Sequence, residues 1–386
     1  MSFKFSNKVV WLFSMEQWTD MRLSKHHYAS ALARAGNRVF FIEPGNKTSK
    51  QIKITEVEPG LKVINHPLLA RGWGKLPYLF YFFLIKREMN FLKKALGGFP
   101  DIAWCFDPLR VVELNVLKNS LCIYHPVDQF DEKMLTRYPL KTKIAFSTMP
   151  VEVEKLKQNG FKAFFITHGL NPTFANFAQQ KLAALDVESV NKTQTELPIK
   201  VGFSGNLLGE AYDRETMRAI IEANPDCEFH FWGKTENPKN YIRLGSYAPE
   251  FITYLKASKN CVVHGIASTE DLATGLNEMD MLWVIWKNTS HPQWNENTNP
   301  HKMMEYISTG LPVMCHYMSI YKDCKWLDMA EQGATPDDYL LLFKKVKHKA
   351  WQLRSCGSGA DKEKLNFALS NTYENHIKQI EAFIYN

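Results

Sequence analysis

The sequence predicts an α/β protein built of two halves, each with a Rossmann-like alternation of strands and helices. The first half opens with an apolar strand at Lys8 to Ser14, a helix from about Met21 to Ala35, and a second strand at Arg38 to Pro44. A strand, a helix and a strand within ~35 residues form a βαβ unit. A new apolar strand at Ile199 to Asn206 opens a second series of the same kind. The length of 386 residues also exceeds what one core usually supports, which favours two domains.

The elements of the first half follow one another as a parallel sheet requires. Its opening strand is apolar throughout, as expected of a strand buried on both faces. Gly36-Asn37 ends the first helix, because glycine adopts the backbone conformation that a helix end needs. Apolar runs bounded by turn residues predict strands at 61–65, 101–106, 120–125, 143–147 and 163–169, with a helix at 151–158. We assign residues 1–174 to this domain.

The second half repeats the alternation. Apolar runs predict strands at 199–206, 228–233, 261–265 and 281–286, with helices at 213–222 and after the capping residue Ser268. We assign residues 198–360 to this domain. The segment 175–197 is polar and rich in Gln, Lys and Asn, as in an interdomain linker or a loose helix, and the tail 361–386 has a helical pattern.

Composition limits the class of protein. Hydrophobic content of 45% and charged content of 23% are ordinary for a folded chain. The cations behind the net charge of +7 are scattered, which argues against a nucleic-acid binder. Seven cysteines without a C-x-x-C pair predict free thiols in a reducing compartment and no zinc site. The N-terminal apolar run is too short for a signal peptide and no run reaches the ~20 residues of a membrane span, so we expect a cytoplasmic protein.

One segment is unusually aromatic and apolar. It runs from Leu76 to Ile85 (LPYLFYFFLI), follows Arg71 and Lys75, and precedes four more cations that end at Lys94. This composition fits an interfacial helix in peripheral contact with the inner membrane surface. It fits equally a buried helix packed on the sheet, and the sequence leaves both alternatives open.

The stretch Asn295 to His316 carries the strongest functional pattern. It predicts a loop, a helix of about three turns with Asn299 as N-cap and Pro300 in the first helical position, and a short buried strand. Lys302 and Glu305 are three residues apart, so they share one helix face near its positive end. A cation beside free N–H groups suits a phosphate, and a carboxylate can accept from paired hydroxyls, so the pattern fits a sugar nucleotide. A plain surface helix with a solvated Lys/Glu pair fits it as well.

The pattern N-P-x-K-x-x-E-Y-x-x-x-G-x-P-V resembles the donor-site helix of GT-B glycosyltransferases, nearest to the retaining family 4 branch and its teichuronic-acid and capsule-type relatives. The resemblance implies two Rossmann-like domains facing a central cleft, with the last helix crossing back onto the first domain. It implies that Glu305 holds the ribose and that the helix start faces the diphosphate. Many members have a glutamate where this chain has Asn297, which would contact the donor sugar.

The resemblance extends to other donor-side residues of the second half. V-G-F-S-G-N is similar to the strand and glycine turn that open the nucleotide domain, and glycine there would let the backbone approach the diphosphate. A glycine turn that merely ends a strand fits the same residues. The remaining donor-side candidates are two cations that would contact phosphate and a backbone segment along the base. The full set is Gly205, Asn206, Arg214, Lys234, Gly265, Asn297, Asn299, Lys302 and Glu305.

Polar residues after three strands of the first half are the acceptor-side and catalytic candidates. Asp107 stands where family members often have a histidine near the donor sugar. His125 and Asp128 are three residues apart and fit a base with its orienting carboxylate, or a structural pair. The loop and helix after the first strand supply four acceptor-side candidates, which are Trp18, Asp20, Arg22 and His26.

The implied reaction transfers a sugar from a nucleoside-diphosphate sugar to a saccharide or lipid-linked hydroxyl acceptor with retention, in cell-surface polysaccharide synthesis. The resemblance implies no metal and no cofactor, and the sequence has no D-x-D motif. Two alternatives remain. A sugar-nucleotide epimerase of the same fold would need more cleft carboxylates than we can place. A non-catalytic sugar-nucleotide or lipid-binding partner is compatible with Asn297, whereas the Lys302/Glu305 helix argues against it.

Overall fold

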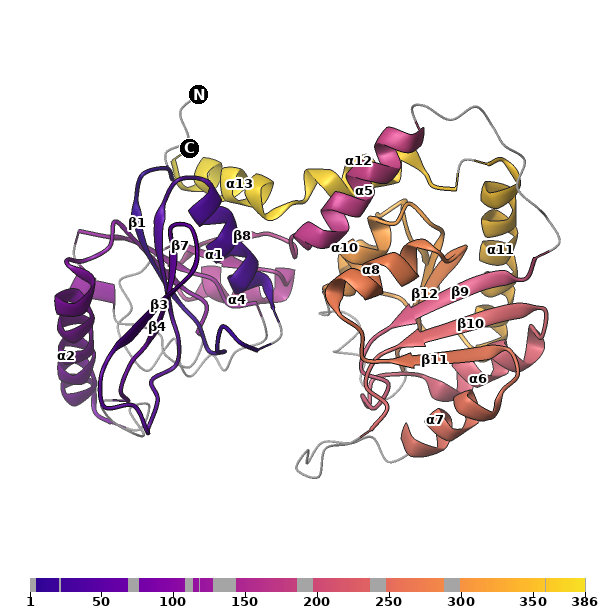
Figure 1. Ribbon diagram of the computed structural model, residues 1–386, viewed down its shortest axis with the longest axis horizontal. Coiled ribbons are helices and arrows are strands. Elements are labelled where there is room, and N and C mark those ends of the chain that lie inside the picture. The colour runs from indigo at the N-terminus through magenta and orange to yellow at the C-terminus, as the bar shows by residue number, and fades with distance from the viewer. Residues whose placement is uncertain are drawn as a thin grey trace. The chain divides into compact units, whose positions relative to one another are not determined.

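The computed structural model describes residues 5–20, 22–68, 76–107, 114–117, 119–127, 144–185, 197–236, 248–287, 299–357 and 359–385. The chain divides into two compact units (Figure 1). Unit 1 comprises Met1–Gly169 with Tyr373–Asn386, and unit 2 comprises Leu170–Thr372. The chain therefore passes between the units twice, near residue 170 and near residue 372.

Unit 1 is built on an eight-stranded sheet with the order β3-β4-β2-β1-β5-β6-β7-β8. All neighbouring strands are parallel except β3, which pairs antiparallel with β4. The central strand β1 buries Trp11 on one face and Leu12 on the other, as its apolar sequence predicted. The strands are β1 Val9–Phe13, β2 Arg38–Ile42, β3 Lys53–Glu58, β4 Leu61–Asn65, β5 Ile102–Cys105, β6 Leu121–Tyr124, β7 Ile144–Ser147 and β8 Lys162–Phe165.

Helices cover both faces of this sheet (Figure 1). The side chains of α2 join the core on one face, and those of α1 and α13 join the core on the other, where Tyr373, Ile377 and Ile380 are buried. The C-terminal helix thus packs on the first unit, as the resemblance implied. The helices are α1 Ser24–Arg34, α2 Tyr78–Leu96, α4 Pro150–Gln158 and α13 Tyr373–Tyr385, with a 3-10 turn at Leu114–Leu117.

Unit 2 is built on a six-stranded sheet with the order β11-β10-β9-β12-β13-β14, in which every pair is parallel. Phe229 of β10 stacks on Phe343 of α11 on one face. Trp232, on the opposite face of β10, packs closely on Gly275 of α8. The strands are β9 Ile199–Ser204, β10 Cys227–Trp232, β11 Cys261–Gly265, β12 Met281–Val284, β13 Val313–Cys315 and β14 Asp328–Met329. The helices are α5 Pro172–Leu185, α6 Arg214–Ala223, α7 Ala248–Ala257, α8 Thr269–Asn277, α10 Lys302–Ile307, α11 Pro336–Ser355 and α12 Lys362–Ser370, with a 3-10 turn at Ser319–Tyr321.

Two segments need comparison with their predictions. Residues 175–185, for which the sequence left a linker and a loose helix open, form the end of α5, because Phe174, Ala175 and Ala178 bury one face of that helix. The tail 361–386 is two helices instead of one: α12 belongs to unit 2 and α13 to unit 1. The break falls at Asn371, whose side chain donates back to the carbonyl of Phe367 (2.8 Å) and so caps α12. Among the described residues, no helix combines the length and apolar character needed to cross a membrane.

Candidate functional site

Three neighbouring strands of unit 2 end in glycine at the carboxyl edge of the sheet. β9, β10 and β11 lead to Gly205, Gly233 and Gly265, which have φ of +155°, +146° and +78°. The N–H of Gly205 donates to the carbonyl of Trp232 (2.9 Å), and the N–H of Gly233 donates to that of Gly265 (2.7 Å). A Cβ on Gly233 would collide with the carbonyl oxygen of Gly205. These three residues, here called the glycine row, carry no side chain at the edge where open α/β sheets bind ligands.

Lys302, the first residue of α10, lies against the glycine row. Its Nζ donates to the carbonyl of Ser204 (2.7 Å) and to the hydroxyl of Tyr212 (3.0 Å). It lies 5.2 Å from the ring centre of Phe203, and a Cβ on Gly205 would collide with it. Burial opposes its charge, but Tyr212 and its other neighbours raise the pKa of Lys302 above the usual value. The lysine is therefore a fixed cation at the end of β9.

Glu305 follows one helical turn later and is partly buried. Among the described residues, no donor forms a hydrogen bond with its carboxylate. Burial raises the pKa of Glu305 to about 7, although the nearby Lys302 ammonium acts in the opposite direction. A carboxyl group with a strongly raised pKa and unused acceptor atoms is typical of a functional site, since a structural carboxylate in such a place is usually paired.

Tyr306 fixes the start of α10 to the end of β9. Its hydroxyl accepts from the backbone N–H of Ser204 (2.7 Å) and from the hydroxyl of the same residue (3.2 Å). Tyr306 and Tyr212, the second partner of Lys302, did not stand out in the sequence analysis. Tyr306 could have been found from its place beside Glu305 in the motif, whereas nothing local in the sequence indicates Tyr212.

The start of α10 differs from its prediction. The helix spans Lys302–Ile307, shorter than three turns, and its N-cap is His301, which makes no side-chain cap. Asn299, expected as N-cap, is instead buried, and its Oδ1 accepts from the hydroxyl of Tyr321 (2.6 Å). That hydrogen bond occupies the oxygen that a cap would need. Asn297 lies outside the described residues, so its predicted contact with the sugar stays a prediction.

The other donor-side candidates surround the turn after Gly205. Arg214 is buried, and its Nη2 donates to the carbonyls of Leu207 (3.0 Å) and Gly209 (2.5 Å). Burial lowers the pKa of Arg214. The guanidinium thus holds the turn in shape, while its predicted contact with phosphate stays untested. Asn206 is exposed, with its Oδ1 accepting from the N–H of Leu208 (3.2 Å), and Lys234 follows the glycine row, partly buried.

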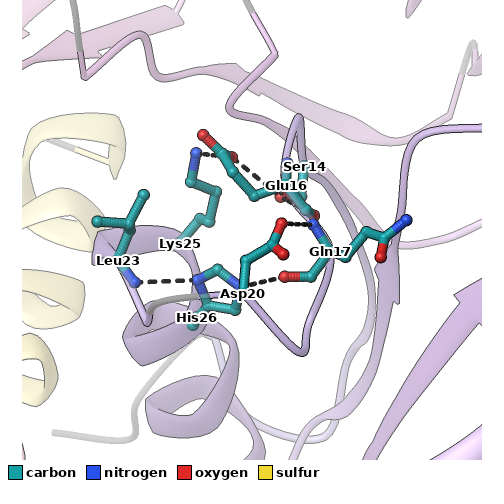
Figure 2. Close-up of polar contacts among 7 residues, drawn as sticks. All are labelled: Ser14, Glu16, Gln17, Asp20, Leu23, Lys25 and His26. Atoms are coloured by element: carbon teal, nitrogen blue, oxygen red, sulfur yellow. Dashed lines mark hydrogen bonds and ion pairs between the residues drawn. The ribbon is translucent and has the colours of Figure 1, made fainter. Parts of the chain in front are cut away.

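The acceptor-side candidates lie in the loop between β1 and α1, which is ordered by its own polar groups (Figure 2). The N–H of Gln17 donates to the carboxylate of Asp20 (2.9 Å), and buried His26 contacts the carbonyl of Gln17 through Nε2 (3.1 Å). Buried Lys25 forms an ion pair with Glu16, as Figure 2 shows. Burial lowers the pKa of His26, which keeps the ring neutral. Asp20 and His26 therefore shape the loop.

Trp18 and Arg22 come together on the same loop. The Arg22 guanidinium lies 5.1 Å from the Trp18 ring centre and 3.5 Å from a carboxylate oxygen of Glu58. The N–H of Trp18 donates to buried Glu43 at the end of β2 (2.8 Å). Glu43 and Glu58 were not among the predicted residues, because each belongs to a strand distant in sequence from the loop that it fixes.

Asp107 and His125 follow the neighbouring strands β5 and β6, as predicted, and both are buried. His125 stacks on Phe106 (4.8 Å between ring centres), and its Nδ1 accepts from the indole N–H of Trp104 (3.3 Å). Burial, and then the nearby His376, lower the pKa of His125 to about 3. These surroundings fit a core side chain better than a general base. Asp128 lies outside the described residues.

The sequence matches no family model and no curated protein. The fold, in contrast, resembles solved structures over nearly its whole length. Sucrose-phosphate synthase from Thermosynechococcus elongatus matches with a TM-score of 0.64 at 15% identity, covering 98% of each chain. HepE from Anabaena, in complex with UDP and glucose, matches with a TM-score of 0.62 at 10% identity, covering 97% of this chain and 98% of its own. A UDP-forming trehalose-phosphate synthase from Burkholderia vietnamiensis matches with a TM-score of 0.61 at 10% identity, covering 98% and 99%.

These similarities confirm the predicted fold class. The chain has the α/β architecture of the GT-B glycosyltransferases, with two parallel-rich sheets in separate domains. The narrower resemblance to the retaining family 4 branch stays a prediction. In the described part of the chain, no three His, Cys, Asp or Glu side chains gather as a metal site would require.

Proposed function

We propose that the protein is a retaining glycosyltransferase that uses a nucleoside-diphosphate sugar. The observation that carries the proposal is the position of Lys302 and Glu305, one helical turn apart, beside the glycine row of a GT-B nucleotide domain. A fixed ammonium beside glycines without side chains suits a diphosphate, and a carboxylate with free acceptor atoms suits the two hydroxyls of a ribose. Two proteins that share the fold involve UDP: HepE was solved in complex with it, and the trehalose-phosphate synthase forms it.

The residues of the candidate site supply charge stabilisation for such a transfer. As the bond between the anomeric carbon and the phosphate oxygen breaks, negative charge grows on the leaving diphosphate, and the Lys302 ammonium lies where it would oppose that charge. The acceptor oxygen forms the new bond on the same face of the sugar, and its proton passes to the leaving phosphate oxygen. This route needs no dedicated base, which agrees with the low pKa that burial gives to His125.

The test is a thermal-shift screen of the purified chain against nucleotides and nucleotide sugars. A ligand that binds only the folded state should stabilise it by about 2.7 kcal/mol at a hundredfold excess over its dissociation constant. We expect one nucleoside diphosphate and its sugar to raise the melting temperature, and Glu305→Gln to remove the shift. Glu222→Gln, which changes an exposed ion pair on α6, is the matched control and should keep it. The absence of a shift with every nucleotide would overturn the proposal.

We further propose that the acceptor is lipid-linked or a saccharide of the cell surface, reached from the inner membrane face. Support comes from α2, which has two different sides. Leu79, Phe80 and Phe83 in its first turns are 77%, 67% and 63% exposed. The opposite side packs into the core of unit 1 through Tyr81, Ile85, Met89, Leu92 and Leu96. The helix therefore has a buried face packed on the sheet and also an exposed apolar end, which supports a contact with the membrane surface.

Charge on α2 also suits an anionic surface. The only acid of the helix, Glu88, is buried and faces His66, with 3.7 Å between its Oε1 and the imidazole Nε2. The exposed ionised side chains that follow the apolar end are all cations, namely Lys86, Arg87, Lys93 and Lys94. An apolar tip followed by cations is the composition by which helices bind the headgroup region of anionic bilayers.

Vesicle flotation tests this contact. The chain should float with phosphatidylglycerol vesicles more than with phosphatidylcholine vesicles, and added salt should weaken binding. Phe80→Ser/Phe83→Ser should abolish flotation, whereas Leu341→Ser, which changes a leucine on α11 that is 69% exposed, should not. Equal flotation of the Phe80/Phe83 variant and the native chain would contradict a role of α2.

A further inference from the structure

The turn that ends α10 is held from outside by two lysines. The carbonyls of residues 309–311 are consecutive, and each accepts a hydrogen bond from another element. Lys181 of α5 donates to the first (3.0 Å), the backbone N–H of Asp361 donates to the second (3.0 Å), and Lys364 of α12 donates to the third. These carbonyls lie beyond the C-cap Ser308, where no helical N–H pairs them, so donors from other elements satisfy them.

Burial disfavours the charged form of both lysines. Lys364 is 4% exposed, and burial lowers its pKa to about 8, although Asp328 and Asp361 act in the opposite direction. Burial likewise lowers the pKa of Lys181 to about 8. A buried ammonium costs stability that a backbone or hydroxyl donor would not. Two such groups on one turn are therefore poorly explained by a contribution to stability alone.

The same short helix is anchored at its other end by the site itself. Lys302 at its start and Tyr306 near its end tie α10 to the end of β9, and Glu305 lies between these two residues, ahead of the lysine-held turn. The hydroxyl of Ser308 in that turn donates to the carbonyl of Glu305 (2.6 Å). A six-residue helix has few hydrogen bonds of its own, so external contacts at both ends set its position.

We propose that Lys181 and Lys364 are positioning residues, which hold α10 so that Glu305 and Lys302 stay aligned at the glycine row. The inference rests on the proposed function, because that alignment matters only if α10 binds the nucleotide. Neither lysine contacts the row itself. Each acts through the backbone of residues 309–311.

The experiment uses Lys181→Met and Lys364→Met, which keep the aliphatic stem and remove the ammonium. Lys347→Met is the matched control, since Lys347 is a partly buried lysine of the same unit, paired with Asp226 (2.6 Å) and distant in sequence from α10. Two quantities are measured in each variant. One is hydrogen exchange of the peptide that covers 302–311 without ligand, and the other is the dissociation constant of the nucleotide that stabilises the native chain.

We expect faster exchange confined to this peptide and a nucleotide affinity about fivefold weaker in both lysine variants. The melting temperature should stay close to that of the native chain, because relief from burying an ammonium offsets the carbonyl that loses its donor. The Lys347→Met variant should match the native chain in exchange and affinity. Unchanged exchange in 302–311 would overturn the inference. So would exchange that rises throughout unit 2 together with a lower melting temperature, which would indicate a purely structural role. If the native chain binds no nucleotide, the proposed function fails, while the exchange data still decide whether the lysines hold the turn.

Discussion

The raised pKa of Glu305 makes the affinity for a nucleotide sugar depend on pH in one direction. In the free protein, burial raises this pKa to about 7. Ribose hydroxyls donate to the ionised carboxylate and favour it, so the pKa falls on binding. The complex then holds fewer protons than the free protein between the two values. Affinity should be fully present above pH 7 and should be lost as the pH falls through 7.

The size of the effect follows from the two pKa values. If the bound ribose returns the carboxyl to its usual value of 4.5, the free protein must lose a proton to bind wherever the pH lies between 4.5 and 7. From about pH 8 to about pH 5.5, the dissociation constant should rise roughly thirtyfold, or about 2 kcal/mol. Lys302 has a raised pKa and stays charged throughout this range, so it adds no slope of its own.

Calorimetric titration with a nucleotide sugar measures this slope, because its diphosphate does not titrate in the range used. Circular dichroism at each pH should confirm that the chain remains folded. Glu305→Gln should bind weakly and with an affinity independent of pH, since the amide does not titrate. Affinity that is flat for the native chain, or that rises on acidification, would refute the role given to Glu305.

Three further predictions concern stability and the glycine row. Burial lowers the pKa of His125 to about 3 and that of His376 to about 4, so both stay neutral in the folded state while the unfolded chain binds protons below pH 6.5. Urea unfolding at about pH 5 should therefore show a free energy of unfolding lower by about 2 kcal/mol per histidine than at pH 7.5. The part due to His376 should vanish in His376→Asn. Gly233→Ala should lower the free energy of unfolding by about 1–3 kcal/mol and abolish nucleotide binding, because its Cβ would collide with the carbonyl of Gly205. A melting curve like that of the native chain would contradict this packing. Tyr306→Phe leaves a buried backbone N–H at the end of β9 without its acceptor and should lower the free energy of unfolding by about 1–3 kcal/mol, measured by urea titration.

The sequence predicted the fold where burial dominates. Central parallel strands are apolar on both faces, so their runs stand out, and the two βαβ series were sufficient to predict two α/β halves. The edge strand β3 (Lys53–Glu58) was missed because its side chains are largely exposed and polar. The long helix α11 received no assignment, although its start carries a capping box of Thr335 and Asp338 with Pro336 between them. A local signal for α11 was therefore present in the sequence.

Helix boundaries and caps were less predictable, because they depend on partners distant in sequence. Asn299 is an ordinary N-cap residue by type, yet Tyr321, beyond β13, takes its side-chain oxygen. Residues 175–185 are rich in Ala, Leu, Gln and Lys, which favour a helix, and their apolar side chains pack on α12 at the end of the unit. A tertiary contact therefore overrides the local preference at Asn299 and agrees with it at 175–185.

In the candidate site, too, the local sequence predicts which residues are present but not which partners they contact. The spacing of Lys302 and Glu305 left a solvated surface pair and a ligand site equally open. The structure argues against a solvated pair, because Lys302 is fixed on Ser204 and Tyr212 and burial raises the pKa of Glu305 to about 7. The ligand contact itself stays a prediction. Arg214 shows the converse. It is a cation in the expected stretch, but its donors hold the turn after Gly205, so residue type alone could not separate a ligand contact from a scaffold contact. The partners of Arg214 are set by the turn after Gly205, and that turn depends on the folded sheet, so they could not be predicted from the local sequence.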